Sequence, residues 1–164
     1  MTLRACLIPL VLCGVLTIGC ESPSTPQSAI TLDQHLVAKD YFTFQLPGNM
    51  NGACGTGVDT YVGWYEGPGL RMWFDFGPAS MVGNLGSFHS EHPKTYQSSI
   101  SGRYCEIAME YMTGRDSLRP YSNYMMCPDV SDSLHWVLNV GFYGRTEGSV
   151  DTAIAVFRSI RFTL

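Results

Sequence analysis

From Thr31 onward, apolar and polar residues alternate mostly with a period of two, and this alternation most constrains the fold. Successive side chains of a β-strand point to opposite faces, so the pattern is typical of strands whose two faces lie in different surroundings. Clusters of Gly, Pro, Asn, Asp and Ser separate the alternating runs and predict turns. The predicted strands span residues 41–46, 58–66, 69–77, 103–112, 121–127 and 133–143.

The clearest pair of strands is the hairpin formed by residues 58–66 and 69–77. The connecting Gly67-Pro68 fits a type II′ turn, with glycine at the position of positive φ and proline after it. Folding about this turn places Tyr65 opposite Leu70. Both faces of the hairpin are rich in aromatic residues, which predicts a sheet covered on both sides.

Helices are fewer than strands in this sequence. A helix is predicted over 150–159, where Ser149 is a candidate N-cap and the apolar residues form a stripe. A second, short helix is predicted over 94–99, after a Gly/Ser-rich loop. Strands that follow one another with few helices between them indicate an α+β fold, here an antiparallel sheet of about six strands flanked by a few helices.

The first twenty residues have the organisation of a secretory signal. Arg4 precedes an apolar stretch, Ala5 to Gly19, which spans only about 22 Å as a helix, less than the roughly 30 Å of a bilayer's hydrocarbon core. The segment 16–20 resembles the lipobox of bacterial lipoproteins, which implies that Cys20 is diacylated and becomes the new N-terminus. Removal of an ordinary signal peptide is the alternative.

These features divide the chain into three parts: a signal peptide (1–19), a lipidated cysteine with a flexible Ser/Pro tether (20–32) and a single α+β domain (33–164). The protein is therefore expected to be exported and anchored to a membrane of a bacterial envelope, inner or outer. Its few cations are scattered, so no nucleic acid partner is expected, and no motif calls for a cofactor.

Four short segments carry a resemblance to a known family. The sequences YFTFQLPG (41–48), VDTYVG (58–63), FDFG (74–77) and AVFRSIRF (155–162) resemble those of small bacterial lipoproteins with the PsbP-like fold. That fold is shared by the extrinsic PsbP protein of photosystem II and the Ran-binding Mog proteins. The resemblance implies an antiparallel sheet sandwiched between helices, and no catalytic residues come with it.

Three cysteines remain after the signal segment and Cys20, so at least one has no partner within the domain. An exported domain favours a disulfide. Folding strand 103–112 onto 121–127 about Asp116 places Cys105 opposite Cys127, which makes this pair the first candidate, with Cys54–Cys105 as the alternative.

Few residues are candidates for chemistry. His89 and His92 form the one cluster of possible metal ligands, but the spacing fits a polar loop better than a zinc site. Cys54 has no base beside it in any recognisable motif. Glu106 and Glu110 share one face of a predicted strand and fit solvated positions. No catalytic or metal site is therefore predicted.

Trp64, Trp73 and Trp136 could line a ligand surface, although large aromatic residues of a two-sided sheet more often belong to the core. A tether, a compact domain and no catalytic constellation together favour a membrane-anchored binding or accessory module. The alternatives are a small envelope hydrolase that uses Cys54, His89 or His92, and a purely structural envelope lipoprotein.

Overall fold

The computed structural model describes residues 30–78, 80, 94–111, 120–130 and 135–163. These residues form ten strands and one helix. The elements are β1 (Gln34–Ala38), β2 (Phe42–Leu46), β3 (Asn51–Thr56), β4 (Tyr61–Gly67), β5 (Leu70–Gly77), β6 (Lys94–Ile100), β7 (Arg103–Tyr111), β8 (Tyr121–Cys127), β9 (Val137–Gly144), α1 (Gly148–Ser159) and β10 (Arg161–Phe162).

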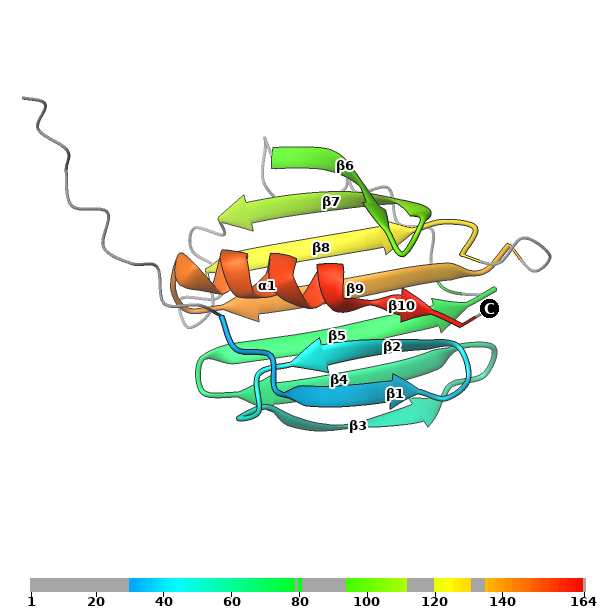
Figure 1. Cartoon of the computed structure of the whole chain (residues 1–164), viewed down its shortest axis with the longest axis horizontal. Coiled ribbons are helices and arrows are strands. Elements are labelled where there is room, and N and C mark those ends of the chain that lie inside the picture. The colour runs from blue at the N-terminus through cyan, green and yellow to red at the C-terminus, as the bar shows by residue number, and fades with distance from the viewer. Residues whose placement is uncertain (1–29, 79, 81–93, 112–119, 131–134, 164) are drawn as a thin grey trace, which may run out of the picture.

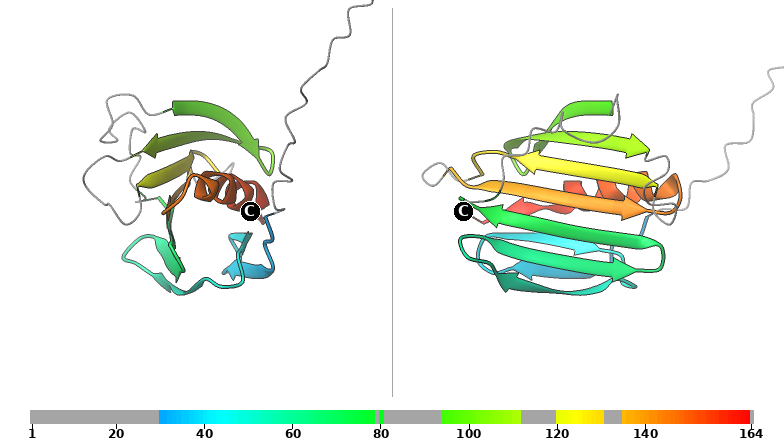
Figure 2. Two further views of the ribbon diagram at one scale, coloured as in Figure 1. Left: turned by 90° about the vertical axis from the view of Figure 1, so that its left-hand side faces the viewer. Right: turned by 180° about the vertical axis from the view of Figure 1, so that it is seen from behind.

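Seven strands form one antiparallel sheet in the order β3-β4-β5-β9-β8-β7-β6, and the other three form a small antiparallel sheet in the order β1-β2-β10. Figure 1 shows α1 lying along β8 and β9, with the small sheet over β3, β4 and β5. Seen from the end in Figure 2, the large sheet curves around α1 and the small sheet. The large sheet therefore has one inner face, which is covered, and one outer face.

The inner face forms the hydrophobic core. Alternate residues of β5 and β9 point inward, among them Met72, Phe74, Val140 and Phe142, and each is at least 99% buried. They meet Phe42 of the small sheet and the apolar stripe of the helix. The stripe consists of Ala153, Val156, Phe157 and Ile160. Burial of this continuous apolar surface is the main favourable contribution to folding.

The sequence prediction of an α+β fold is confirmed in its coarse form, because the structure combines antiparallel sheet with helix. The described residues contain less helix and more sheet than predicted. Among the described residues there is one helix, and the layer on the inner face is partly a second sheet. Segment 94–99, expected as a short helix, is strand β6, because its backbone pairs with that of β7 in an antiparallel ladder. Strand β3 is not among the strands predicted from the sequence.

The hairpin of β4 and β5 is confirmed, but its predicted register is wrong by two residues. Tyr65 lies opposite Met72, not Leu70, and the two-residue turn is Pro68-Gly69. Gly69 has φ +72°, so proline takes the first central position and glycine the second, as a type II turn requires. A shift by two residues keeps every side chain on its predicted face.

The predicted pairing of β7 with β8 is confirmed in register, since Glu106 lies opposite Met126 and Ile107 opposite Met125. Extension of this ladder places Cys105 opposite Cys127. Their sulfur atoms are 1.98 Å apart, a disulfide within the core. Helix α1 also begins two residues before the predicted start. Its N-cap is Glu147, and Ser149 instead lies buried in the first turn with its hydroxyl donating to the carbonyl of Thr146.

Candidate binding surface on the outer face of the sheet

Four aromatic residues gather on the outer face of the large sheet, and we call this surface the aromatic face. They are Trp64 on β4, Trp73 on β5, Tyr124 on β8 and Tyr143 on β9. Trp64 is 55% exposed, and the other three are partly buried. Strand alternation places them here, because their sequence neighbours Tyr65, Phe74, Met125 and Phe142 fill the inner face.

A glycine makes room for the central ring of the aromatic face. Trp64 lies directly opposite Trp73, and Trp73 lies opposite Gly141. A Cβ atom at position 141 would be 2.2 Å from the indole Nε1 of Trp73, so the ring lies over the glycine backbone. Any larger residue there would displace the indole.

Hydrogen bonds fix three of the four rings relative to one another. The indole Nε1 of Trp73 donates to the hydroxyl of Tyr143 over 3.1 Å, and the hydroxyl of Tyr124 donates to the same oxygen over 2.9 Å. The rings of Tyr124 and Tyr143 are perpendicular, with centroids 5.6 Å apart. Burial, and then the hydrogen bond to Tyr143, raise the pKa of Tyr124 above its usual value. This part of the aromatic face is thus rigid and uncharged.

Polar groups border the rings along β5. On one side Arg71 pairs with Glu66, and both side chains are about half exposed. On the other side lies Asp75, whose Oδ1 atom is buried and makes no hydrogen bond. Asn139, opposite Asp75 in β9, donates to the hydroxyl of Ser80 over 2.8 Å. A buried carboxylate oxygen without a partner is costly, and Asp75 thus adds a polar residue to this side of the rings.

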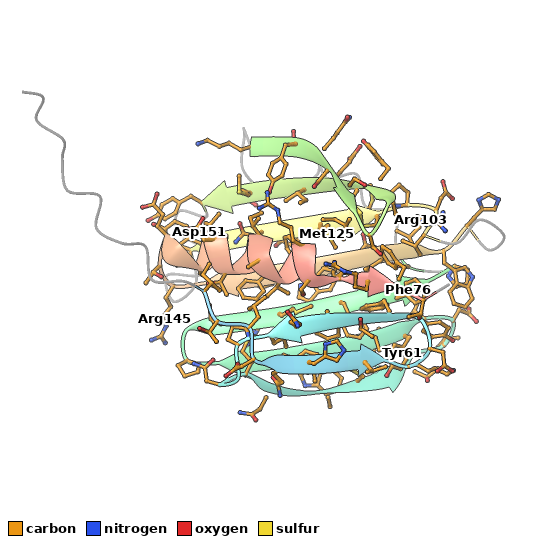
Figure 3. The ribbon with its side chains drawn as sticks, viewed as in Figure 1. Tyr61, Phe76, Arg103, Met125, Arg145 and Asp151 are labelled. Carbon is orange, nitrogen blue, oxygen red and sulfur yellow. A yellow bond between two sulfur atoms is a disulfide. The ribbon has the colours of Figure 1, made fainter. Side chains whose placement is uncertain are left out.

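A second candidate is a hollow of about 670 Å³ at the end of the molecule where α1 begins. Asp151 lies at this end in Figure 3, as does Arg145, while Tyr61 and Phe76 lie toward the opposite end. The hollow is bordered by Glu147 and Asp151, but acidic residues in the first helical turn are what the helix dipole favours. These carboxylates therefore have a structural reason for their position, and the aromatic face remains the better candidate.

The three tryptophans lie in two different surroundings. Trp64 and Trp73 belong to the outer face, whereas Trp136 packs on the core, with ring centroids 5.3 Å from Tyr41 and 5.2 Å from Phe76. Tyr124 and Tyr143 were missed. Their alternation within each strand was visible, but the pairing of β5 with β9 joins segments about 65 residues apart, and no local pattern predicts it.

The other candidates from the sequence are not brought together. Cys54, a free thiol, lies on β3, and its Sγ is 2.8 Å from the hydroxyl of Tyr65. Burial and this contact raise the pKa of Tyr65, so the phenol stays protonated and cannot serve as a base near neutral pH. His89, His92 and Cys20 lie outside the described residues. Glu106 and Glu110 share the outer side of β7, as expected, although Glu110 is 92% buried.

Within the described ranges, no group of three or more His, Cys, Asp or Glu side chains is placed to hold a metal ion. No helix in that part of the chain is long and apolar enough to cross a membrane. Comparisons of this chain with protein-family models, with curated proteins and with solved structures find no match.

Proposed function

We propose that this protein is a lipid-anchored, extracytoplasmic binding module whose ligand site is the aromatic face. The apolar segment that ends at Cys20, followed by a Ser/Pro-rich stretch, supports export and anchoring. The disulfide between Cys105 and Cys127 is consistent with an oxidising compartment. The membrane is one partner, through the acyl chains.

The observation that carries the binding role is the exposure of Trp64. Trp64 is 55% exposed at the β4 end of the row of rings, directly opposite Trp73. An aromatic residue that stays more than half exposed forgoes much of its burial energy in the free protein, and this supports an interaction site. A purely structural lipoprotein would not need it.

We further propose a relationship to lipoproteins with the PsbP-like fold. The segments 41–48, 58–63, 74–77 and 155–162 support it, and they form β2, the β4–β5 hairpin and the end of the chain from α1 to β10. The single helix among the described residues departs from a sheet sandwiched between helices. The relationship concerns the fold and adds no activity.

The anchor is tested by mass spectrometry of the mature protein purified from membranes of a bacterial host. We expect an N-terminal acylated Cys20, and we expect Cys20→Ser to release the protein from the membrane fraction with its domain folded. Recovery of a mature protein that begins at Met1 or carries no acyl groups would rule out the anchor.

The hydrolase alternative has its own test. It requires Cys54, His89 or His92, so a triple alanine variant with unchanged export, folding and phenotype would eliminate it. Cys54 is half-buried against Tyr65, and we expect its replacement to be tolerated. Loss of phenotype in the triple variant, with retention in a Trp64→Ala variant, would instead contradict the binding role of the aromatic face.

A further inference from the structure

We propose that the ligand of the aromatic face is an extended, neutral glycan chain whose sugar rings stack on Trp64 and Trp73. This inference rests on the proposed function for the site and adds the chemical class of the ligand. It follows from three features: the length of the aromatic row, the polar borders on each side of it and the balance of charge.

The row is longer than one sugar ring. Trp64, Trp73 and Tyr124 lie on β4, β5 and β8, and Gly141 of β9 fills the one register position between them. Neighbouring strands are about 4.8 Å apart, so the row extends roughly 14 Å across the sheet. A row of this length suits a chain better than a single small molecule.

The chemistry of the surface matches that of a pyranose. The C–H groups on one face of a sugar ring carry small positive charges and pack on the electron-rich face of an aromatic ring, while the hydroxyl groups project from the rim. Arg71 and Asp75 are each two residues from Trp73 on the same face of β5, about 6.6 Å to either side. Hydroxyls of a stacked sugar would thus meet hydrogen-bonding groups on both sides.

Other ligand classes fit less well. A nucleic acid or another polyanion needs unpaired cations, and Arg71 at the border of the rings is already paired with Glu66. The centre of a protein interface is usually depleted of acidic residues, whereas Glu66 and Asp75 both adjoin the central rings. Arg71, Glu66 and Asp75 together carry one net negative charge, which disfavours a polyanion and is compatible with an uncharged glycan.

The test measures binding of neutral β-1,4-linked oligosaccharides to the full acylated protein in detergent micelles. Chitohexaose and cellohexaose are the probes, and tryptophan fluorescence and calorimetry measure their binding. Heparin is the charged comparison. We expect saturable binding of at least one neutral probe that heparin does not displace. Trp64→Ala should weaken it about tenfold, as loss of one stacked ring predicts, and Trp64→Phe should restore most of the affinity.

Tyr111→Ala is the matched control, because Tyr111 is also an exposed aromatic residue, 58% exposed, but lies at the end of β7 away from the aromatic face. It should bind the probe as the unaltered protein does. Both alanine variants should keep the thermal unfolding midpoint, since they replace exposed side chains.

Two results would overturn the inference: no saturable binding of either neutral probe, or equal affinities for the Trp64→Ala variant and the unaltered protein. A second experiment distinguishes failure of the glycan inference from failure of the proposed function. A photo-crosslinking residue is introduced at position 64, and the molecules that it captures in cells are identified. Capture of a protein alone, on an acylated chain, would leave the binding module standing and refute the glycan. Absence of acylation at Cys20 would refute the anchor, whatever the probes do.

Discussion

On both faces of the large sheet, a glycine on a neighbouring strand accommodates an aromatic ring of β5. On the inner face, the ring of Phe74 on β5 lies over Gly63, the residue opposite it on β4. On the outer face, the preceding residue, Trp73, lies over Gly141 of β9. In each case the missing side chain lets an aromatic ring lie on the neighbouring backbone.

The surroundings of the two rings differ. Phe74 is 99% buried, with the ring centroid of Phe42 at 5.2 Å and that of Phe44 at 5.8 Å, so it stabilises the fold through apolar burial. Trp73 has a hydrogen bond to Tyr143 and an exposed neighbour, Trp64. Stability is therefore concentrated on the inner face, whereas the outer face is the proposed binding surface, and the following predictions test this division.

The largest effect is expected from Phe74→Ala. Loss of a fully buried aromatic ring leaves a cavity between the two sheets, and the free energy of unfolding should fall by about 3–5 kcal/mol. Chemical denaturation of the purified protein measures it. Phe74→Leu, which keeps most of the volume, should lose clearly less. A loss below about 1 kcal/mol for the alanine variant would show that the inner face does not carry the stability.

The disulfide is the next contribution on the inner face. Cys105 and Cys127 are fully buried and 22 residues apart in sequence, so replacing both with alanine should lower the free energy of unfolding by roughly 3 kcal/mol. Cys54→Ala is the control and should retain most of the stability, because this thiol is free. Equal losses in the two variants would contradict the assignment of the disulfide.

The inner face was more predictable from the sequence than the outer face, for physical reasons. Alternation fixes which side chains share a face, and a local turn fixes the register to within two residues, as the β4–β5 hairpin shows. The pairing of Cys105 with Cys127 followed from the same local reasoning. These features depend on segments close in sequence.

The aromatic face depends instead on contacts between distant segments. Trp73 meets Tyr143 because β5 pairs with β9, and β6, β7 and β8 intervene in the chain between them. Segment 94–99 was misassigned for a related reason, since its alternation is weak and its pairing with β7 decides its conformation. Sequence reasoning could identify the tryptophans but not the surface that they form.

On the outer face, Gly141→Ala should have an intermediate effect. The new methyl group would displace the indole of Trp73 and break its hydrogen bond to Tyr143, at a cost of about 1–3 kcal/mol in unfolding free energy. Glycan affinity should fall as well, because the row of rings would no longer be aligned. The readouts are denaturation and the oligosaccharide titration. Unchanged affinity with reduced stability would separate Trp73 from the binding site.

The smallest effect concerns the pH dependence of stability. Burial and the hydrogen bond to Tyr143 raise the pKa of Tyr124 above the usual value of 10.0. Above pH 10 the unfolded chain therefore loses this proton before the folded protein does, so the free energy of unfolding falls as pH rises from there, and Tyr124 has no such effect below pH 10. Tyr124→Phe should lose about 1 kcal/mol near neutral pH, through the missing hydrogen bond, and then decline less steeply.

Denaturation between pH 8 and pH 11 measures this difference, best in a Cys54→Ala background, where thiol–disulfide exchange cannot interfere at high pH. The decline should persist in part in the Tyr124→Phe variant, because burial also raises the pKa of Tyr65 on the inner side of β4. Tyr111→Phe, at an exposed position, should follow the unaltered protein throughout. Identical slopes for Tyr124→Phe and the unaltered protein would contradict the raised pKa of Tyr124, and with it the burial and hydrogen bonding ascribed to this hydroxyl.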